Sequence, residues 1–176
     1  MIRRAGPQDV PFLRDMLRHA FYWRLNDPGS DELPISRYVE GWGREGDRAL
    51  IAIDDFQRVG AAWYRLFRPD RPGYGFLDEA TPELAIAVVP SRRGRGFGHE
   101  LLQALMEQAR NDGFEALSLS VDRDNPSVKL YESYGFEKVE DEDGACTMRA
   151  ELGGLAAAGR LYDRTEPTEE SREDGM

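Results

Sequence analysis

The clearest hydrophobic pattern in the chain lies between residues 83 and 121. Glu83 to Val89 is almost continuously apolar, as in a strand that is buried on both faces, and Pro90 ends this run. The next hydrophobic residues recur at helical spacing: Leu101, Leu102, Leu105, Met106 and Ala109. Gly113 follows where a C-terminal helix cap belongs, and residues 116–121 then alternate between apolar side chains and serines. The pattern predicts a strand, a helix and a second strand parallel to the first.

Weaker patterns on either side predict the remaining elements. Before this unit they indicate a strand at 2–5, a helix capped by Asp9, a second helix over 35–43, and strands at 49–53 and 59–67. After it they indicate a short helix capped by Asn125 and strands at 136–139 and 146–152. The order predicts an α/β (α+β) fold whose mixed, mostly antiparallel central sheet carries helices on both faces.

Composition narrows the class of protein. The chain has 176 residues, 40% of them hydrophobic, and a single cysteine, so we expect one domain without a disulfide framework. No apolar run approaches a membrane span, and no secretory signal is visible, which favours a cytoplasmic protein without a membrane partner. The two histidines belong to no group with zinc spacing, so we expect no metal site.

Charge separates the body of the chain from its end. The net charge is −10, and acids concentrate in 137–143 and 161–176, which leaves the rest near neutral. This balance argues against nucleic-acid binding, whose affinity comes from phosphate neutralisation. From residue 153 the chain offers little to bury, so we expect a domain over 1–152 and a flexible acidic tail over 153–176.

An arginine-glycine loop follows the central strand. Gly94, Gly96 and Gly98 allow a ligand to approach the backbone just where a helix begins, and its unpaired N–H groups favour an anion. Three arginines, at 92, 93 and 95, add positive charge, so the loop is predicted to hold a phosphate or pyrophosphate. No Lys-Ser or Lys-Thr completes a P-loop, and His99 stands where a dinucleotide-binding fingerprint has its third glycine.

Two motifs in the right order and at the right separation carry a resemblance to a known family. The pattern Arg93-x-x-Gly96-x-Gly98 resembles the acetyl-CoA loop of the GNAT (GCN5-related N-acetyltransferase) family. Asn125, Tyr131 and the pair Gly135-Phe136 resemble the second motif of that family. The resemblance covers roughly residues 1–152, with its specific part at 83–136.

The resemblance implies acetyl-CoA (coenzyme A) as the cofactor and a set of residues that bind it. The pyrophosphate would lie on the loop, and the pantetheine arm would lie between the two parallel strands, which splay apart in this family. The implied cofactor-binding residues are Val88, Val89, Arg93, Gly94, Arg95, Gly96, Phe97, Gly98, His99 and Asn125.

Catalytic roles follow from the needs of acetyl transfer. Backbone N–H at Val88 or Val89 is the natural oxyanion donor, and the resemblance makes Tyr131 the general acid that protonates the departing thiolate. Glu83 is the first candidate for the base, since it lies just outside an apolar run where burial would raise its pKa. Asp122 and Glu79 rank behind it.

The acceptor would bind beside segments that contain no family motif from which the acceptor could be identified. Residues 68–82 are interpreted as a flap over the acceptor side, and His19 is interpreted as structural. Several aromatic residues are candidates either for the core or for the acceptor pocket: Phe21, Tyr22, Trp23, Tyr38 and Trp42.

The resemblance therefore implies an acetyl-CoA-dependent N-acetyltransferase. It would move an acetyl group to a primary amine of a small molecule or protein by direct attack in a ternary complex. The alternative is a non-catalytic acyl-CoA-binding regulatory domain, and a nucleotide-binding oxidoreductase is a distant third. Members of the family often form dimers, so a homodimer stays open, and the acceptor is not identified.

Overall fold

The computed structural model of the protein describes residues 1–25, 34–142 and 144–153. Its strands are β1 Ile2–Arg4, β2 Arg48–Asp54, β3 Gln57–Arg65, β4 Glu83–Val88, β5 Ala116–Asp122, β6 Glu137–Glu142 and β7 Ala145–Glu151. Its α-helices are α1 Val10–Ala20, α2 Tyr22–Leu25, α3 Phe97–Asn111 and α4 Ser127–Ser133. Short 3₁₀ helices cover Pro7–Asp9, Ile35–Tyr38 and Pro90–Arg92. The order of the seven strands and the places of α1, α3 and α4 agree with the sequence prediction, whereas α2 was not predicted. The tail predicted from residue 153 lies almost wholly outside the described residues.

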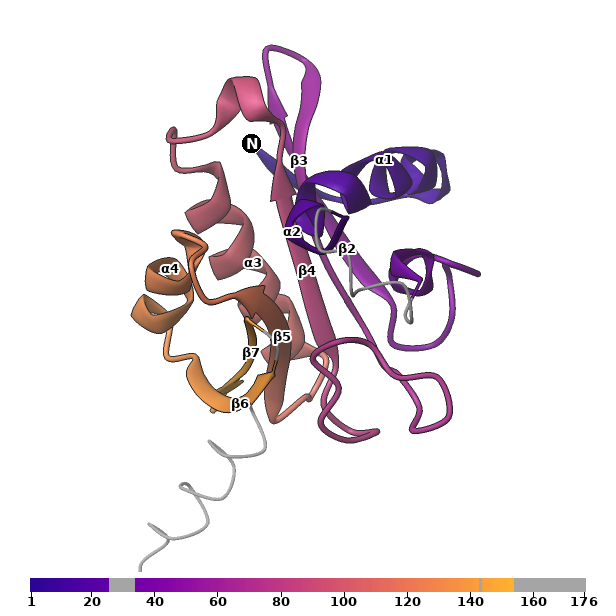
Figure 1. Cartoon of the computed structure of the whole chain (residues 1–176). Coiled ribbons are helices and arrows are strands. Elements are labelled where there is room, and N and C mark those ends of the chain that lie inside the picture. The colour runs from indigo at the N-terminus through magenta and orange to yellow at the C-terminus, as the bar shows by residue number, and fades with distance from the viewer. Residues whose placement is uncertain (26–33, 143, 154–176) are drawn as a thin grey trace, which may run out of the picture.

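The seven strands form one sheet in the order β1-β2-β3-β4-β5-β7-β6. Every neighbouring pair is antiparallel except β4 and β5, which run parallel and are joined through α3. Figure 1 shows α3 and α4 on one side of the sheet and α1 and α2 on the other. The prediction of a mixed sheet with helices on both faces is confirmed.

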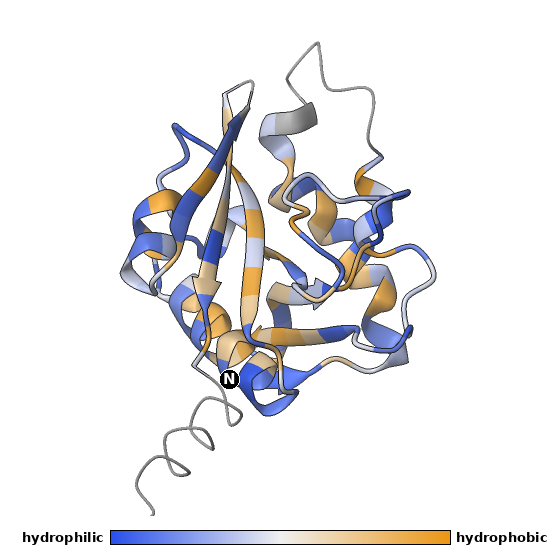
Figure 2. Cartoon of the chain, turned by 90° about the horizontal axis from the view of Figure 1, so that it is seen from below, coloured by the Kyte–Doolittle hydropathy of each residue, from blue (hydrophilic) through white to orange (hydrophobic). Residues whose placement is uncertain are grey.

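Each face of the sheet has its own hydrophobic core. On one face, the apolar side of α3 packs on β2 to β5 and β7 together with Tyr131 and Phe136. On the other face, α1 packs against Ile51, Trp63 and Ala85 of the central strands. In Figure 2 the hydrophobic residues run along the strands and along the helices beside them. Within the described ranges, no helix is long and apolar enough to cross a membrane.

Two local predictions were wrong. The helix expected over 35–43 is only a short 3₁₀ turn, because the carbonyls of Arg37 and Glu40 accept hydrogen bonds from Arg65 instead of continuing a helix. Asp9 does not cap α1 with its side chain. It is fully buried, pairs with Arg3 and Arg58, and accepts a bond from the Gly6 N–H, contacts that lower its pKa.

Candidate active site

The site begins where β4 and β5 part. The two strands pair in register only at Glu83 and Ser118, with the Ser118 N–H donating to Pro82 O at 3.0 Å. Beyond this pair the strands diverge, and a cavity of about 470 Å³ opens between them. Its wall is built from both strands, the arginine-glycine loop, α4 and the junction of α1 with α2. The cavity therefore connects the two faces of the sheet.

The backbone of β4 presents alternate N–H groups to this opening. The Val89 N–H donates to Val59 O at 2.8 Å and is thus taken up by β3. Since N–H directions alternate along a strand, the Val88 N–H points toward β5, beyond the last residue that β5 pairs with. Val88 also lines the cavity and Val89 does not. Of the two oxyanion donors expected from the sequence, the structure brings Val88 to the site.

The arginine-glycine loop forms one end of the cavity. Gly94 (φ +77°) and Gly96 (φ +87°) adopt left-handed backbone conformations that side chains disfavour, and α3 starts directly after them at Phe97. The loop residues that line the cavity are Arg92, Arg93, Gly94, Gly96, Phe97, Gly98 and His99. The first N–H groups of α3 have no partner within the helix, as an anion site requires, and the binding of a phosphate there remains a prediction.

The three arginines of the loop are held differently. Arg92 pairs with Asp54 at the end of β2 (2.9 Å), and Arg95 lies 4.0 Å from the same carboxylate. The Arg93 Nε donates to Val88 O at 3.2 Å. Asp54 was not singled out in the sequence because it is 38 residues away from Arg92. Arg95 does not line the cavity, although its backbone belongs to the loop.

The second motif lies across the cavity from β4. Asn125 accepts a hydrogen bond from the Ser127 N–H (2.9 Å) and so starts α4, and both Asn125 and Tyr131 line the cavity. The Tyr131 ring packs edge-on against Phe136, and burial raises the pKa of its hydroxyl, which stays protonated at neutral pH. Tyr134 packs against His99 outside the cavity, as expected for a structural side chain.

Glu83 is buried at the narrow end of the fork, as we call the opening between β4 and β5 beyond the Glu83–Ser118 pair. Its carboxylate accepts hydrogen bonds from the Tyr38 hydroxyl and from the Gly75 N–H (3.0 Å). Only 1% of Glu83 is exposed, and this burial raises the pKa of its carboxyl to about 8. Glu83 does not line the cavity, whereas Ala85, two residues along the same face of β4, does.

The other two carboxylate candidates lie in different surroundings. Asp122 is half-buried at the end of β5 and accepts a hydrogen bond from the Asp124 N–H at 2.9 Å. Glu79 is exposed in the loop 68–82. Neither of them lines the cavity. Among the three, Glu83 alone is buried, and that burial raises the pKa of its carboxyl.

The loop 68–82 covers Glu83 rather than the mouth of the cavity. A Cβ on Gly73 would lie 2.4 Å from the Glu83 carboxylate, and one on Gly75 would lie 2.6 Å from the Leu119 backbone. These two glycines thus let the loop backbone rest directly on β4 and β5. The interpretation of this segment as a flap on the acceptor side remains a prediction.

The junction of α1 and α2 forms the other wall of the cavity. His19, Phe21, Tyr22 and Trp23 all line it, although His19 was interpreted from the sequence as structural. The signal that could have shown this is its place in the last turn of α1, two residues before the three consecutive aromatic residues 21–23.

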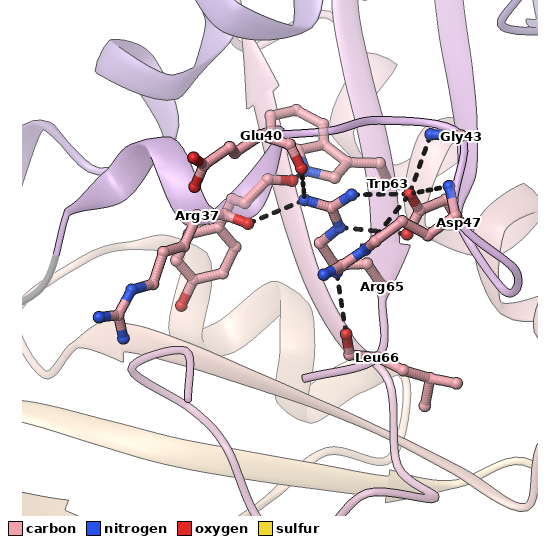
Figure 3. A network of polar contacts seen from close by, with 9 residues as sticks. Arg37, Glu40, Gly43, Asp47, Trp63, Arg65 and Leu66 are labelled. Atoms are coloured by element: carbon pink, nitrogen blue, oxygen red, sulfur yellow. Dashed lines mark hydrogen bonds and ion pairs between the residues drawn. The ribbon is translucent and has the colours of Figure 1, made fainter. Parts of the chain in front are cut away.

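A buried ion pair holds the segment that carries Tyr38 (Figure 3). Arg65 donates to both carboxylate oxygens of Asp47 (2.7 and 3.1 Å), and each of these side chains is only 1% exposed. The Arg65 Nη1 donates to the carbonyls of Arg37 and Glu40, on either side of Tyr38, and Trp42 stacks on the guanidinium. Tyr38 is thereby fixed beside Glu83. Of the five aromatic candidates, Tyr38 and Trp42 lie in this network and not on the cavity wall.

The comparisons with known proteins agree with the geometry. A model of the acetyltransferase (GNAT) family matches residues 10–136. An L-methionine sulfoximine/L-methionine sulfone acetyltransferase of Pseudomonas paraeruginosa is 30% identical over 142 residues, which cover 77% of this chain and 79% of that protein. A [ribosomal protein bS18]-alanine N-acetyltransferase of Haemophilus influenzae is 42% identical over 64 residues, 36% of this chain and 43% of that one.

Solved structures match over most of the chain. The ribosomal-protein-alanine N-acetyltransferase of Brucella melitensis superposes with a TM-score of 0.63 at 27% identity, over 86% of this chain and 99% of that one. A chain named yncA from Salmonella typhimurium, solved with its cofactor acetyl-CoA, shares the fold with a TM-score of 0.65 at 21% identity, over 86% and 93% of the two chains. The relatives are named as acetyltransferases, which does not favour a purely regulatory domain. The chain therefore belongs to the GNAT acetyltransferase family and is an acetyl-CoA-dependent N-acetyltransferase.

Proposed function

We propose that acetyl transfer takes place in the fork between β4 and β5, by direct attack of a primary amine in a ternary complex. The observation that carries this proposal is the single register pair between the two strands, at Glu83 and Ser118, with the cavity beyond it. In the fork, the N–H groups of β4 that point toward β5, such as that of Val88, lie beside the cavity. An extended chain that carries amide groups, such as pantetheine, can pair with them there.

The residues of the loop and of α4 fit the bound form of coenzyme A. Backbone N–H groups from Gly94 to His99, together with Arg93, would hold the pyrophosphate, and Asn125 would contact the pantetheine. The left-handed glycines at 94 and 96 support this assignment because they keep side chains away from the ligand. Asp54 would hold Arg92 and Arg95 at the edge of the loop without taking part in transfer.

Three groups of the chain would then act on the reacting atoms. Glu83 accepts the proton that the acceptor ammonium must lose before its nitrogen can attack the thioester carbonyl. The Val88 N–H donates to the carbonyl oxygen as it gains negative charge. The Tyr131 hydroxyl gives its proton to the departing sulfur, and its burial against Phe136 keeps it protonated until then.

The acceptor would enter from the side of α1 and α2. His19 and the aromatic residues 21–23 line that part of the cavity, on the same face of the sheet as Glu83. The names of relatives suggest the first amines to offer: L-methionine sulfoximine, L-methionine sulfone, phosphinothricin, and a peptide that begins with alanine. We further propose that residues 1–152 form the catalytic domain, that 153–176 are an appended acidic tail, and that the enzyme works in the cytoplasm, alone or as a homodimer.

Thermal unfolding tests cofactor binding first. A ligand at 100 times its Kd adds about 2.7 kcal/mol to native stability. For a protein of this size that is a rise of roughly 5–10 °C in Tm. We expect this rise with acetyl-CoA and with CoA, and none with NADH or ATP. Gly96→Ala supplies the matched variant, because its left-handed backbone disfavours a side chain at the loop, and its shift with CoA should shrink.

Thiol release from acetyl-CoA in the presence of the amine panel then tests transfer. Turnover with at least one amine, and none after Glu83→Gln at pH 7, is the expected result. No stabilisation by either CoA species would refute the assignment of the fork as the cofactor site. Full activity of Glu83→Gln would assign the base to another group.

A further inference from the structure

The hydroxyl of Ser118 is a buried polar group that the acetyltransferase reaction has not yet explained. Ser118 is 0% exposed, and its Oγ has no hydrogen-bond partner among the described residues. Buried hydroxyls are nearly always bonded in native proteins, and an unpaired one costs about 1–3 kcal/mol. An alanine would fill this position without that cost, so the hydroxyl calls for a functional reason.

The sheet register places Ser118 directly beside Glu83. The two residues form the single parallel pair between β4 and β5. Leu117 and Leu119 point into the core beneath α3, so Ser118 points to the opposite face, which is also the face of Ala85 and Glu83. The two side chains therefore start from neighbouring positions at the closed end of the fork, on the acceptor side of the sheet, with no hydrogen bond between them in this structure.

Ser120 continues this polar line into the cavity. It follows Ser118 by two residues, so it shares the same face, and it lines the cavity that Glu83 does not reach. Two residues along a strand span roughly 6.6 Å, a gap that one water molecule can bridge by hydrogen bonds. Gly75 covers this stretch with backbone alone, since a Cβ there would lie 2.8 Å from the Ser120 nitrogen. Ser118 and Ser120 therefore form a narrow polar strip beside the hydrophobic residues of β4 on this face of the sheet.

We propose that Ser118 is a positioning residue that links the cavity to Glu83. The proton of the acceptor ammonium passes through Ser120 and a bridging water to Ser118, whose hydroxyl, unbonded in this structure, turns to donate to the buried carboxylate. The inference rests on the proposed role of Glu83 as the base. One N–H bond of the ammonium breaks, each oxygen along the line takes one proton and passes on another, and the last proton ends on the Glu83 carboxylate. No group is oxidised or reduced, and the same line returns the proton after the product leaves.

Ser118→Ala tests the inference through the pH dependence of kcat/KM. At pH 7 we expect a loss of about tenfold to hundredfold, part of the 10²–10⁴ that a general base contributes. Affinity for CoA, read from the thermal shift, should not change. The loss should narrow as the pH approaches about 10, because an alkylamine then arrives already neutral and needs no base. Ser118→Thr keeps a hydroxyl on the same strand and should restore most of the rate.

Thr147→Val supplies the matched control, since it removes a buried hydroxyl from the neighbouring strand β7 that does not line the cavity. We expect it to keep the wild-type rate. A purely structural Ser118 predicts the opposite of the proposal: Ser118→Ala would be as stable as the wild type or more stable, with unchanged kcat/KM at every pH. That result, together with an inactive Glu83→Gln variant, would overturn the proposed role of Ser118 and leave Glu83 as the base.

Two further outcomes complete the test. Full activity of Glu83→Gln would overturn the proposed base and the link together. If Ser118→Ala does not fold, Ser118→Cys takes its place, because the thiol is close in size and a weak hydrogen-bond partner. An unchanged pH profile of that folded variant would overturn the inference, and a loss at pH 7 that narrows at high pH would support it.

Discussion

Replacing Glu83 by glutamine should make the protein less sensitive to alkaline pH. The Glu83 carboxyl is buried, and its pKa is raised from 4.5 to about 8 in the native state. Between these two values, the native protein holds a proton that the unfolded chain releases. Native stability must therefore fall as the pH rises from about 4.5 to 8, and it should level off outside that window. Glutamine is neutral throughout and removes this dependence.

The size of the effect follows from the two pKa values. Linkage gives a loss of roughly 2–3 kcal/mol of wild-type stability between pH 5 and pH 7 from this one group, and a further loss of roughly 1 kcal/mol by pH 9. Glutamine has one carbonyl oxygen for the two donors, the Tyr38 hydroxyl and the Gly75 N–H, so the variant should begin less stable at pH 5. This offset does not change with pH, whereas the gap between the two proteins narrows or reverses as the pH rises.

Urea unfolding of both proteins at pH 5, 6, 7, 8 and 9 measures this difference. All other titrating groups are common to the two proteins, so the change in their stability difference reports on Glu83 alone. Glu79→Gln, an exposed position in the same loop, is the matched control and should follow the wild type. A stability difference that stays constant from pH 5 to 7 would show that Glu83 titrates normally and would refute the reasoning from burial.

Three further substitutions test other parts of the site. Tyr131→Phe should lower kcat by a factor on the order of 10² with CoA affinity retained, measured by steady-state kinetics and thermal shift, and an unchanged kcat would move the acid role elsewhere. Arg65→Ala leaves the buried Asp47 carboxylate unpaired and should cost about 3–5 kcal/mol in urea unfolding; a cost below 1 kcal/mol would contradict the importance of the pair. Gly75→Ala should lift the loop from β5, with a stability loss of about 1–3 kcal/mol and a lower kcat/KM, whereas wild-type values would mean that the loop yields freely.

Local patterns in the sequence identified the parts of the site that follow one another along the chain. The run from Glu83 to Val88, the glycines at 94 and 96, and the start of α4 at Asn125 each depend on neighbouring residues, and all are found in the structure. Only partial burial of Glu83 was expected from its place just outside the apolar run, and the structure buries it almost completely.

Pairings between distant residues were not visible in the sequence. Arg65 and Asp47 are 18 residues apart, and nothing in their surroundings shows that β3 brings them together. The helix expected over 35–43 failed for the same reason, because Arg65 takes the carbonyl groups that the helix needed. The neighbourhood of Ser118 and Glu83 depends on strand order, which sequence periodicity cannot supply.

The fork also divides the sheet into two leaves. Six residue pairs join β3 to β4 and seven join β5 to β7, whereas the leaves β1–β4 and β5–β7 meet at one pair only. Main-chain pairing across the gap is therefore left to whatever lies in it. In the proposed binding mode the pantetheine arm would pair with β4 as an additional strand does. Amide exchange at Ile86 and Val88 should then slow on binding, while that at Val89, already bonded to Val59, should not change. Beyond that one pair, a cofactor bound in the proposed position would supply the main-chain link between the two leaves.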